Sequence, residues 1–276
     1  MFLVYDKNMN LLTFPDGVKP LDIFISSIQK ERVSEKVEGV HGSINKGFTY
    51  GSRDVELKLL LKARDAKDYR LLRDEVFAMF RRGELYISEE YQKGKRYLIS
   101  PDEPFIPERF DNNRRLATAN INCNMPSLPF AESIGKTQDI QRAGIVNEEL
   151  WGHGMGLLDD SLVYTVTATS FNIFNAGTEP IHPFQQDLKI TISQVAGSTS
   201  FLQLKNNTNG TIFKANKAVS NSEKLVIDGP RVTSNSLEYL RDTNKTFIQL
   251  DPGWNSFSLT GATSAKIEFD FRFYYS

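Results

Sequence analysis

A strict alternation of side chains over residues 54–63 most constrains how this 276-residue chain can fold. Val55, Leu57, Leu59 and Leu61 are apolar, and most of the residues between them are charged. Because successive side chains of a strand point to opposite faces, this period of two predicts a strand with one buried face. The strand therefore needs a second layer that covers the apolar side of its sheet.

The next segment supplies that layer, because its apolar residues change to a helical spacing. The apolar stripe consists of Tyr69, Leu72, Val76, Phe77 and Phe80. Asp65 is typical of a helix N-cap, and Gly83 is typical of the residue that follows a helix. Leu85 then begins another apolar run, so the unit is predicted as strand, helix and strand, with the helix packed on the sheet.

Two neighbouring segments before this unit are less regular. Leu21, Ile23 and Ile25 alternate and predict a strand, and the charged segment Glu31–Glu38 is interpreted as a candidate partner for it. Four glycines between residues 39 and 51 predict turns there rather than a regular element.

The first half ends with another alternating strand, from Ala117 to Met125, which places Cys123 on the inner face. This is the sole cysteine, so the chain has no internal disulfide and is predicted to fold in a reducing cytoplasm. Prolines at 126 and 129 stop the strand. We therefore expect two domains, residues 1–133 and 134–276.

Residues 162–275 have the composition of an all-β domain. Short β-branched and aromatic runs, including Thr246–Leu250, alternate with Gly, Asn, Ser and Pro turns at the spacing of a β-sandwich. The weak pattern of residues 134–160 predicts a linker that leads into the first strand. Its glycines around Trp151 do not predict a phosphate loop, because no lysine follows them.

The charges and histidines predict no catalytic, cofactor or metal site. The net charge is −1, which gives no general attraction to nucleic acid or to an anionic membrane. No apolar run is long enough to span a bilayer. His41, His153 and His182 lie in separate segments without metal-ligand spacing. The acidic pairs at 89–90, 148–149 and 159–160 are weak candidates for acid–base catalysis, because adjacent side chains of a strand point to opposite faces.

Three aromatic residues of the second half are candidates for stacking on a sugar: Trp254, Tyr239 and Trp151. The alternative for Trp254, which follows the turn Asp251-Pro252-Gly253, is that it closes the end of the core.

An ordered set of segments resembles the distal tail protein (Dit) family of long-tailed, non-contractile bacteriophages that infect Gram-positive bacteria. The segments are Gly47–Val55, Leu72–Phe77, Gly94–Tyr97, Pro129–Glu132, Asn175–Pro183, Leu225–Asp228, Leu250–Asn255 and Lys266–Phe269. The resemblance implies a mainly β fold. Its first domain would be a β-sandwich or split barrel with one α-helix, and its second a galectin-like β-sandwich similar to a carbohydrate-binding module.

The resemblance also implies a structural role without enzymatic activity. Family members form a homo-hexameric ring that joins the tail tube protein to the tail-associated or tail-tip protein, and to receptor-binding proteins. The ring lies at the virion tail tip, after assembly in the host cytoplasm, and lets the tape measure and DNA pass without sequence-specific binding or membrane insertion. The alternative function is a lectin-like protein that contacts host cell-wall saccharide.

The charged face of the predicted helix is the candidate surface toward a neighbouring subunit or the ring lumen. It carries Arg70, Arg73, Asp74 and Arg81. Because a DNA passage should not hold phosphate strongly, mixed charges suit it better than a basic lining.

Overall fold

The computed structural model describes residues 1–39, 41–110, 115–147, 149–157 and 162–276. Glu148, Asp159 and Asp160, members of two of the acidic pairs, lie outside these residues. The chain forms two compact units. The first comprises Met1–Gln92, Arg96–Ala131 and Ser276, and the second comprises Lys93–Lys95 and Glu132–Tyr275. Both are built mainly of antiparallel strands, so the predicted mainly β class is confirmed.

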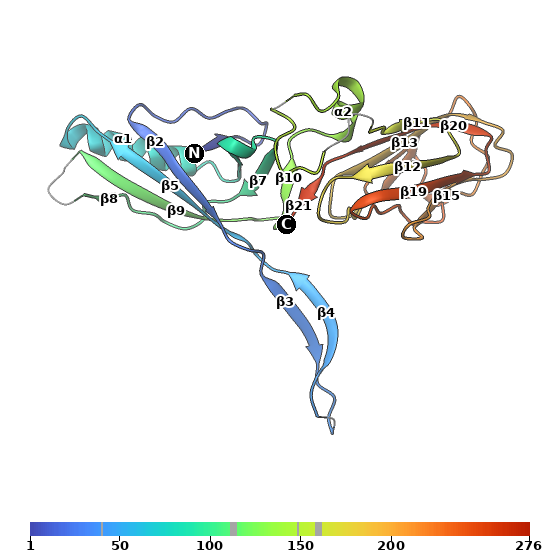
Figure 1. The fold of residues 1–276 in the computed structure, drawn as a ribbon, viewed down its shortest axis with the longest axis horizontal. Helices are drawn as coiled ribbons and strands as arrows, with labels where there is room; N and C mark the ends of the chain where they lie inside the picture. Colours follow the sequence, from blue (N-terminus) through green and yellow to red (C-terminus); the bar gives the residue numbers. More distant parts are fainter. Residues whose placement is uncertain (40, 111–114, 148, 158–161) are drawn as a thin grey trace. The chain divides into compact units, whose positions relative to one another are not determined.

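The first unit is organised around a four-stranded antiparallel sheet of order β2-β5-β9-β8 (Figure 1). Its strands are β2 (Val18–Ile25), β5 (Asp54–Lys62), β9 (Leu116–Asn124) and β8 (Glu108–Arg109). The alternation of β5 is confirmed, since its apolar set Val55, Leu57, Leu59 and Leu61 is buried and the residues between are partly or fully exposed. One face of this sheet is therefore core and the other is open.

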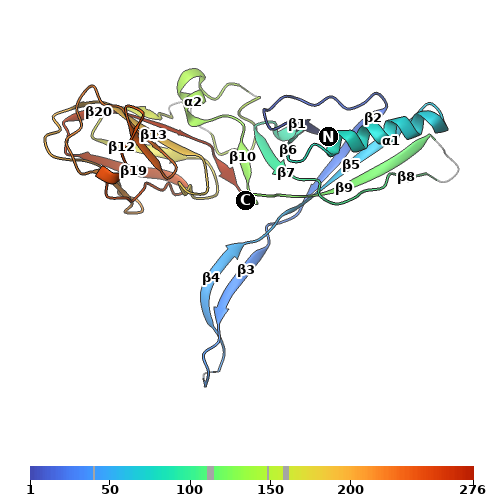
Figure 2. The same ribbon diagram turned by 180° about the vertical axis from the view of Figure 1, so that it is seen from behind.

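Helix α1 (Ala66–Phe80) covers the buried face of that sheet (Figure 2). The predicted N-cap is confirmed, because the Asp65 carboxylate accepts the backbone N–H groups of Lys67 at 2.7 Å and Asp68 at 2.9 Å. The buried stripe consists of Tyr69, Leu72, Val76, Met79 and Phe80. Phe77 is a correction: its ring is half-buried at the edge of the stripe, and Met79 takes the core position.

A second small sheet completes the first unit. Strand β1 (Phe2–Tyr5) pairs antiparallel with β6 (Leu85–Glu89), which forms a hairpin with β7 (Lys95–Ile99) through the short helix η1 (Glu90–Gln92). Phe2, Val4, Leu85 and Ile87 are all buried.

A long hairpin interrupts the path from β2 to β5. It consists of β3 (Lys30–Glu35) and β4 (Ile44–Tyr50), and it extends beyond the four-stranded sheet (Figure 1). Two expectations are wrong here. The charged segment pairs with β4 rather than with β2, and the glycine-containing stretch holds a strand. Gly47, at φ 112°, lies beside the register shift between Arg32 and Ser34, so the glycine accommodates a bulge within the strand.

The main segment of the second unit begins within β10 (Ala131–Ser133), and helix α2 (Thr137–Ala143) follows in place of the predicted linker. The first residue of α2 is hydrogen-bonded to another part of the second unit, since the Thr137 hydroxyl donates to the Phe269 carbonyl at 2.8 Å. The short amphipathic signal of a seven-residue helix explains why the sequence pattern did not reveal it.

Two antiparallel sheets form most of the second unit. One has the order β11-β20-β13-β16-β17-β18 and the other β12-β19-β14-β15. The first contains β11 (Thr165–Val166), β20 (Ser264–Phe271), β13 (Leu188–Ala196), β16 (Leu225–Asp228), β17 (Arg231–Ser234) and β18 (Leu237–Glu238). The second contains β12 (Ser170–Asn175), β19 (Gly253–Thr260), β14 (Leu202–Asn206) and β15 (Ile212–Ala215). The remaining elements are η2 (Leu240–Asp242) and β21 (Tyr274–Tyr275).

The two sheets face each other across an aromatic core, as expected for a sandwich. Phe257 of β19 lies 5.1 Å from Phe269 of β20, centroid to centroid, and Phe171 of β12 stacks on Phe257 at 5.4 Å. The expected strand at Thr246–Leu250 is wrong. That segment is a loop with one bridge, between Ile181 and Leu250, because its backbone bonds to neighbouring side chains instead of a ladder.

Buried asparagines explain two segments of the family resemblance. Asn255 closes the turn before β19, since its carboxamide accepts from the Asp251 N–H at 2.9 Å and donates to the Asp251 carbonyl at 2.8 Å. Asn175 likewise accepts from the Gly177 N–H at 3.0 Å. A Cβ at Gly177 would lie 2.5 Å from the Tyr274 carbonyl oxygen, so only glycine fits there.

Candidate functional site

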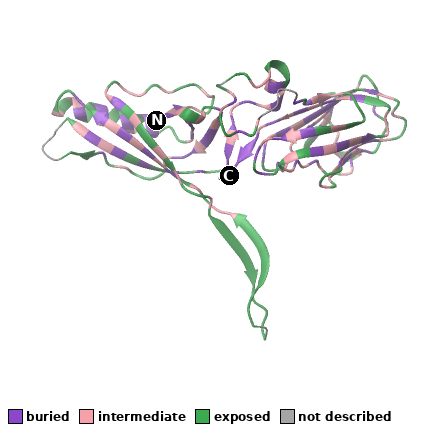
Figure 3. Ribbon diagram, viewed as in Figure 1, coloured by how far each residue is buried: buried purple, intermediate pink, exposed green. Residues whose placement is uncertain are grey.

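The β3–β4 hairpin is the most exposed element of the first unit (Figure 3). All six residues of β3 are exposed, and so are all residues of β4 except Tyr50. Its exposed side chains include the apolar residues Val33, Val37, Ile44 and Phe48. A two-stranded hairpin without a covering layer is marginally stable in water. This hairpin therefore has the character of an element that is completed by contact with another surface.

The base of the hairpin is clamped by one arginine. The Arg53 Nε donates to the Ser26 carbonyl at 2.7 Å, and its Nη1 donates to the Pro129 carbonyl at 3.3 Å. The guanidinium carbon lies 5.8 Å from the centroid of the Tyr97 ring. These contacts join the end of β2, the start of β5 and the segment after β9. The position at which the two hairpin strands leave the sheet is therefore fixed.

Aromatic rings continue from this clamp along β4. Phe48 contacts Tyr50 at 5.3 Å, and Tyr50 contacts Phe130 at 5.4 Å, both edge to face. The Lys30 ammonium lies 5.1 Å from the Phe48 ring centroid. Part of the Gly47–Val55 segment of the resemblance thus forms the root of the hairpin, and Lys46 and Glu35 form an ion pair farther along it.

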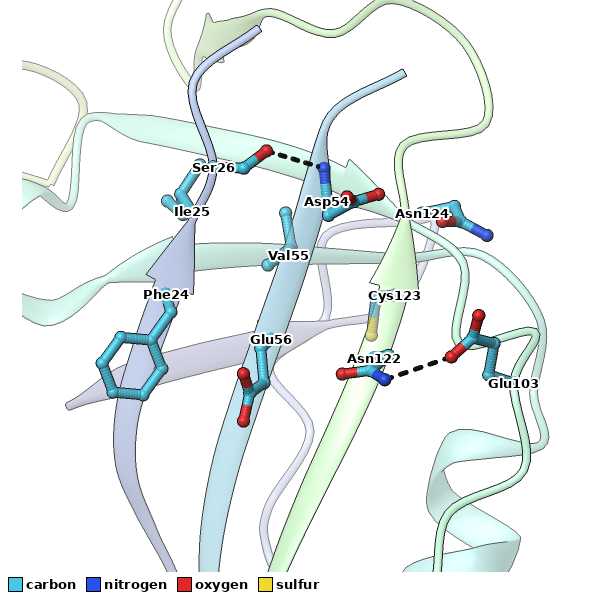
Figure 4. A pocket seen from close by; sticks show the side chains of 10 residues that line it. All are labelled: Phe24, Ile25, Ser26, Asp54, Val55, Glu56, Glu103, Asn122, Cys123 and Asn124. Atoms are coloured by element: carbon cyan, nitrogen blue, oxygen red, sulfur yellow. Dashed lines mark hydrogen bonds between the residues drawn. The ribbon is translucent and has the colours of Figure 1, made fainter. Parts of the chain in front are cut away.

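The open face of the four-stranded sheet carries rows of polar residues across its strands. The register places Asp22, Lys58 and Asn120 in one row, and Phe24, Glu56 and Asn122 in the next. A hollow of about 460 Å³ lies at the second row, close to the hairpin base (Figure 4). Asn122 donates to the Glu103 carboxylate at 3.1 Å there, and the Ser26 hydroxyl accepts from the Asp54 N–H at 3.0 Å.

Cys123 backs this hollow from the buried side of the sheet. Burial, with a smaller effect from the Asp102 carboxylate, raises the pKa of the Cys123 thiol to about 12. The thiol is therefore protonated at neutral pH, and the protonated form is a poor nucleophile.

The charged helix residues lie on the side of α1 that faces away from the core. Arg70, Asp74 and Arg81 are exposed, while Arg73 is half-buried. Arg73 donates from Nη2 to the adjacent Asp74 carboxylate at 2.8 Å, and its guanidinium carbon lies 5.8 Å from the Phe77 ring centroid. The four residues thus share one outer face, as the sequence predicted, and whether that face meets a neighbour stays a prediction.

The three candidate sugar-stacking residues have different surroundings. Trp151 is only 6% exposed and packs against Phe273 and the backbone of Gly135, so its ring faces are covered and it is corrected to a core residue. Trp254 is 57% exposed, and its ring lies 4.9 Å from that of Phe174. Tyr239 is half-buried, and burial raises the pKa of its hydroxyl, helped by the carboxylates of Glu223 and Asp242.

Two searches of the described residues bear on other site types. No group of three or more His, Cys, Asp or Glu side chains in them is placed to hold a metal ion. In the same residues, no helix combines the length and apolar character needed to cross a membrane.

Sequence reasoning missed the hairpin as a functional element. The charged segment was interpreted as a partner of the strand at residues 21–25, and the glycines at 39–51 hid its true partner strand. The signal that could have revealed it is the lack of an apolar face over residues 30–36, where Val33 is the single apolar residue, which is typical of a solvent-exposed strand.

Comparison with known proteins agrees with this geometry. Residues 15–125 match the phage tail protein RIFT-related domain. The crystal structure of SPP1 Dit (gp 19.1), described as a paradigm of the hub adsorption apparatus in phages infecting Gram-positive bacteria, matches with a TM-score of 0.66 at 12% identity over 99% of each chain. The phage p2 baseplate in its activated conformation with Sr gives a TM-score of only 0.39 at 10% identity, over 98% of this chain and 97% of that one. No curated protein sequence matches the chain.

The resemblance noted in the sequence is therefore confirmed. The chain carries a phage tail domain in its first unit and has the fold of a distal tail protein over its whole length.

Proposed function

We propose that this chain, a phage tail protein with the fold of a distal tail protein, is the hub subunit at the end of a siphophage tail. Six copies close into a ring that joins the tail tube protein to the tail-tip protein and supports receptor-binding proteins. The ring assembles in the host cytoplasm, is carried at the virion tail tip, and lets the tape measure and DNA pass.

The observation that carries this proposal is the exposed hairpin. In a ring with rotational symmetry, each subunit uses two different patches: one patch, here called the donating patch, contacts the other, receiving patch of the next subunit. A ribbon with exposed apolar residues, anchored rigidly at Arg53, suits the donating patch. The receiving patch then covers Val33 and Phe48 and provides the packing that the hairpin lacks.

The two faces of the first unit suit different roles in such a ring. Helix α1 covers one face of the sheet, so the open face and the outer side of α1 point in opposite directions. The open face mixes acids, a lysine and amides in its rows, which suits a passage for a polyanion because no cluster of cations retains phosphate. The outer side of α1, with Arg70 and Asp74, is then available to a neighbour or to another tail protein.

The test replaces apolar hairpin residues by charge and measures the mass in solution. Light scattering of the unchanged chain should give a closed oligomer of six times the subunit mass of 31.3 kDa. Combining Val33→Asp and Phe48→Asp should leave a folded monomer, because both side chains are exposed in the single chain.

Leu237→Asp is the matched control, since Leu237 is also an exposed apolar strand residue but belongs to the second unit. It should retain the oligomer. An unchanged oligomer in the hairpin variant, or an unchanged chain that stays monomeric over a wide concentration series, would remove the support for the ring.

A further inference from the structure

The geometry points to a second kind of site, a hollow in the second unit that binds a saccharide carrying an acidic substituent. The hollow has a volume of about 700 Å³. Its floor is the outer side of strands β14 and β15, and its walls are the loops at 182–184 and 244–249. It lies entirely within the second unit, so the inference goes beyond the assembly role and does not depend on it.

One side of the hollow is aromatic. Phe184 is 56% exposed, and its ring meets that of Phe247 edge to face at 5.0 Å. The centroid of the His182 ring lies 5.3 Å from that of the Phe184 ring. An exposed ring of this size is a surface that water solvates poorly, and its negative π-face attracts weakly positive C–H groups. The apolar face of a pyranose ring presents such C–H groups.

The floor of the hollow is polar. Gln203 of β14 and Lys214 of β15 are cross-strand partners whose side chains lie on the outer face, and Gln249 approaches from the loop. Among the described residues, the carboxamides of Gln203 and Gln249 have no hydrogen-bond partner, so both remain available to a ligand. A carboxamide both donates and accepts, which is what a sugar hydroxyl requires. An apolar wall with a few convergent polar groups is the usual composition of a ligand site.

The charge of the hollow selects among saccharides. Lys214 and Lys245 both line it, and none of the described residues that line it carries a carboxylate. The Lys214 ammonium lies 4.8 Å from the centroid of the Phe201 ring. A saccharide with a carboxylate or phosphate group therefore fits this site better than a neutral sugar.

The wall formed by the loop at 244–249 is held by hydrogen bonds before any ligand arrives. The Lys214 N–H donates to the Asn244 carboxamide at 3.0 Å, and the Asn244 N–H donates to the Lys214 carbonyl at 2.9 Å. The Gln249 carbonyl accepts from Asn206 at 2.8 Å and from Asn209 at 3.1 Å. Binding therefore requires little ordering of the protein, which favours affinity.

Saturation-transfer difference NMR on the full chain tests the inference with three probes: glucuronic acid, glucose and inorganic phosphate. Glucuronic acid should bind, glucose should bind more weakly, and phosphate alone should not displace glucuronic acid. Phe184→Ala should lower the affinity for glucuronic acid by about tenfold, equivalent to about 1.4 kcal/mol of binding free energy. Lys214→Gln should remove the preference for glucuronic acid over glucose.

Leu237→Ala is the matched control, because Leu237 is also an exposed apolar residue of the second unit but does not line the hollow. Thermal melting of each variant checks that the second unit remains folded. No saturation transfer to either sugar, displacement of glucuronic acid by phosphate, or loss of binding in Leu237→Ala with retention in Phe184→Ala would each overturn the assignment.

Discussion

Two phenylalanines of helix α1 provide a matched test of how the first unit is held together. Phe77 and Phe80 both meet the ring of Phe105 edge to face, at 5.2 and 6.2 Å between centroids. They differ in burial, since Phe80 is only 3% exposed and Phe77 is half-buried. Because the contact with Phe105 is common to both, the difference between their alanine variants measures the burial of the ring.

Phe80→Ala should lower the unfolding free energy of the first unit by about 3–5 kcal/mol, the cost of a full ring deletion that leaves a cavity. Phe77→Ala should cost only about 1–2 kcal/mol, because roughly half of the transfer free energy of a buried ring is lost and solvent fills the site. The ordering of the two variants is the essential result.

Hydrogen exchange of β5 amides measures this free energy, because a central strand exchanges through opening of the whole unit. It also separates the first unit from the second, which a single melting curve of two units does not. Equal costs for the two variants, or a cost below about 1 kcal/mol for Phe80→Ala, would show that α1 does not bury this face as described.

Four further predictions follow from the same structure. Asp65→Ala should lower the melting temperature at pH 7, because backbone N–H groups of Asp68 and Lys67 hold the pKa of this carboxyl below its usual range. The difference should begin to shrink below about pH 4 and be lost only as pH falls through the lowered pKa of the folded chain. Asp270→Asn should raise the melting temperature at pH 7, because burial raises the pKa of Asp270 and its buried Oδ1 has no partner among the described residues. The folded state then loses stability as pH rises above about 4, and the advantage of the variant should shrink at lower pH. Cys123 should react with iodoacetamide at pH 8 only after unfolding, and rapid labelling of the folded chain would contradict its burial and raised pKa. Residues 1–133 expressed alone should give a helical, cooperatively melting protein, and an aggregated product would count against an independent first domain.

The sequence determined the local pattern of the first unit well. The alternation in β5 and β9, the stripe and N-cap of α1, and the inward position of Cys123 could all be read directly, because each depends on the period of one element and the burial of one face. The burial of Trp151 and Phe77 was predicted less well. Both are large and apolar, and composition alone does not reveal how much of a ring its neighbours cover.

Only the tertiary structure decided which strands pair and which surfaces remain open. β3 pairs with β4 across a bulge at Gly47, and no periodicity in the sequence indicates this pairing. The saccharide hollow is likewise assembled from segments that are up to 67 residues apart, His182 to Gln249, and hydrogen bonds between loops hold them together. Such sites arise from contacts between residues far apart in the sequence, whereas a sequence pattern indicates only which face of a single helix or strand is buried.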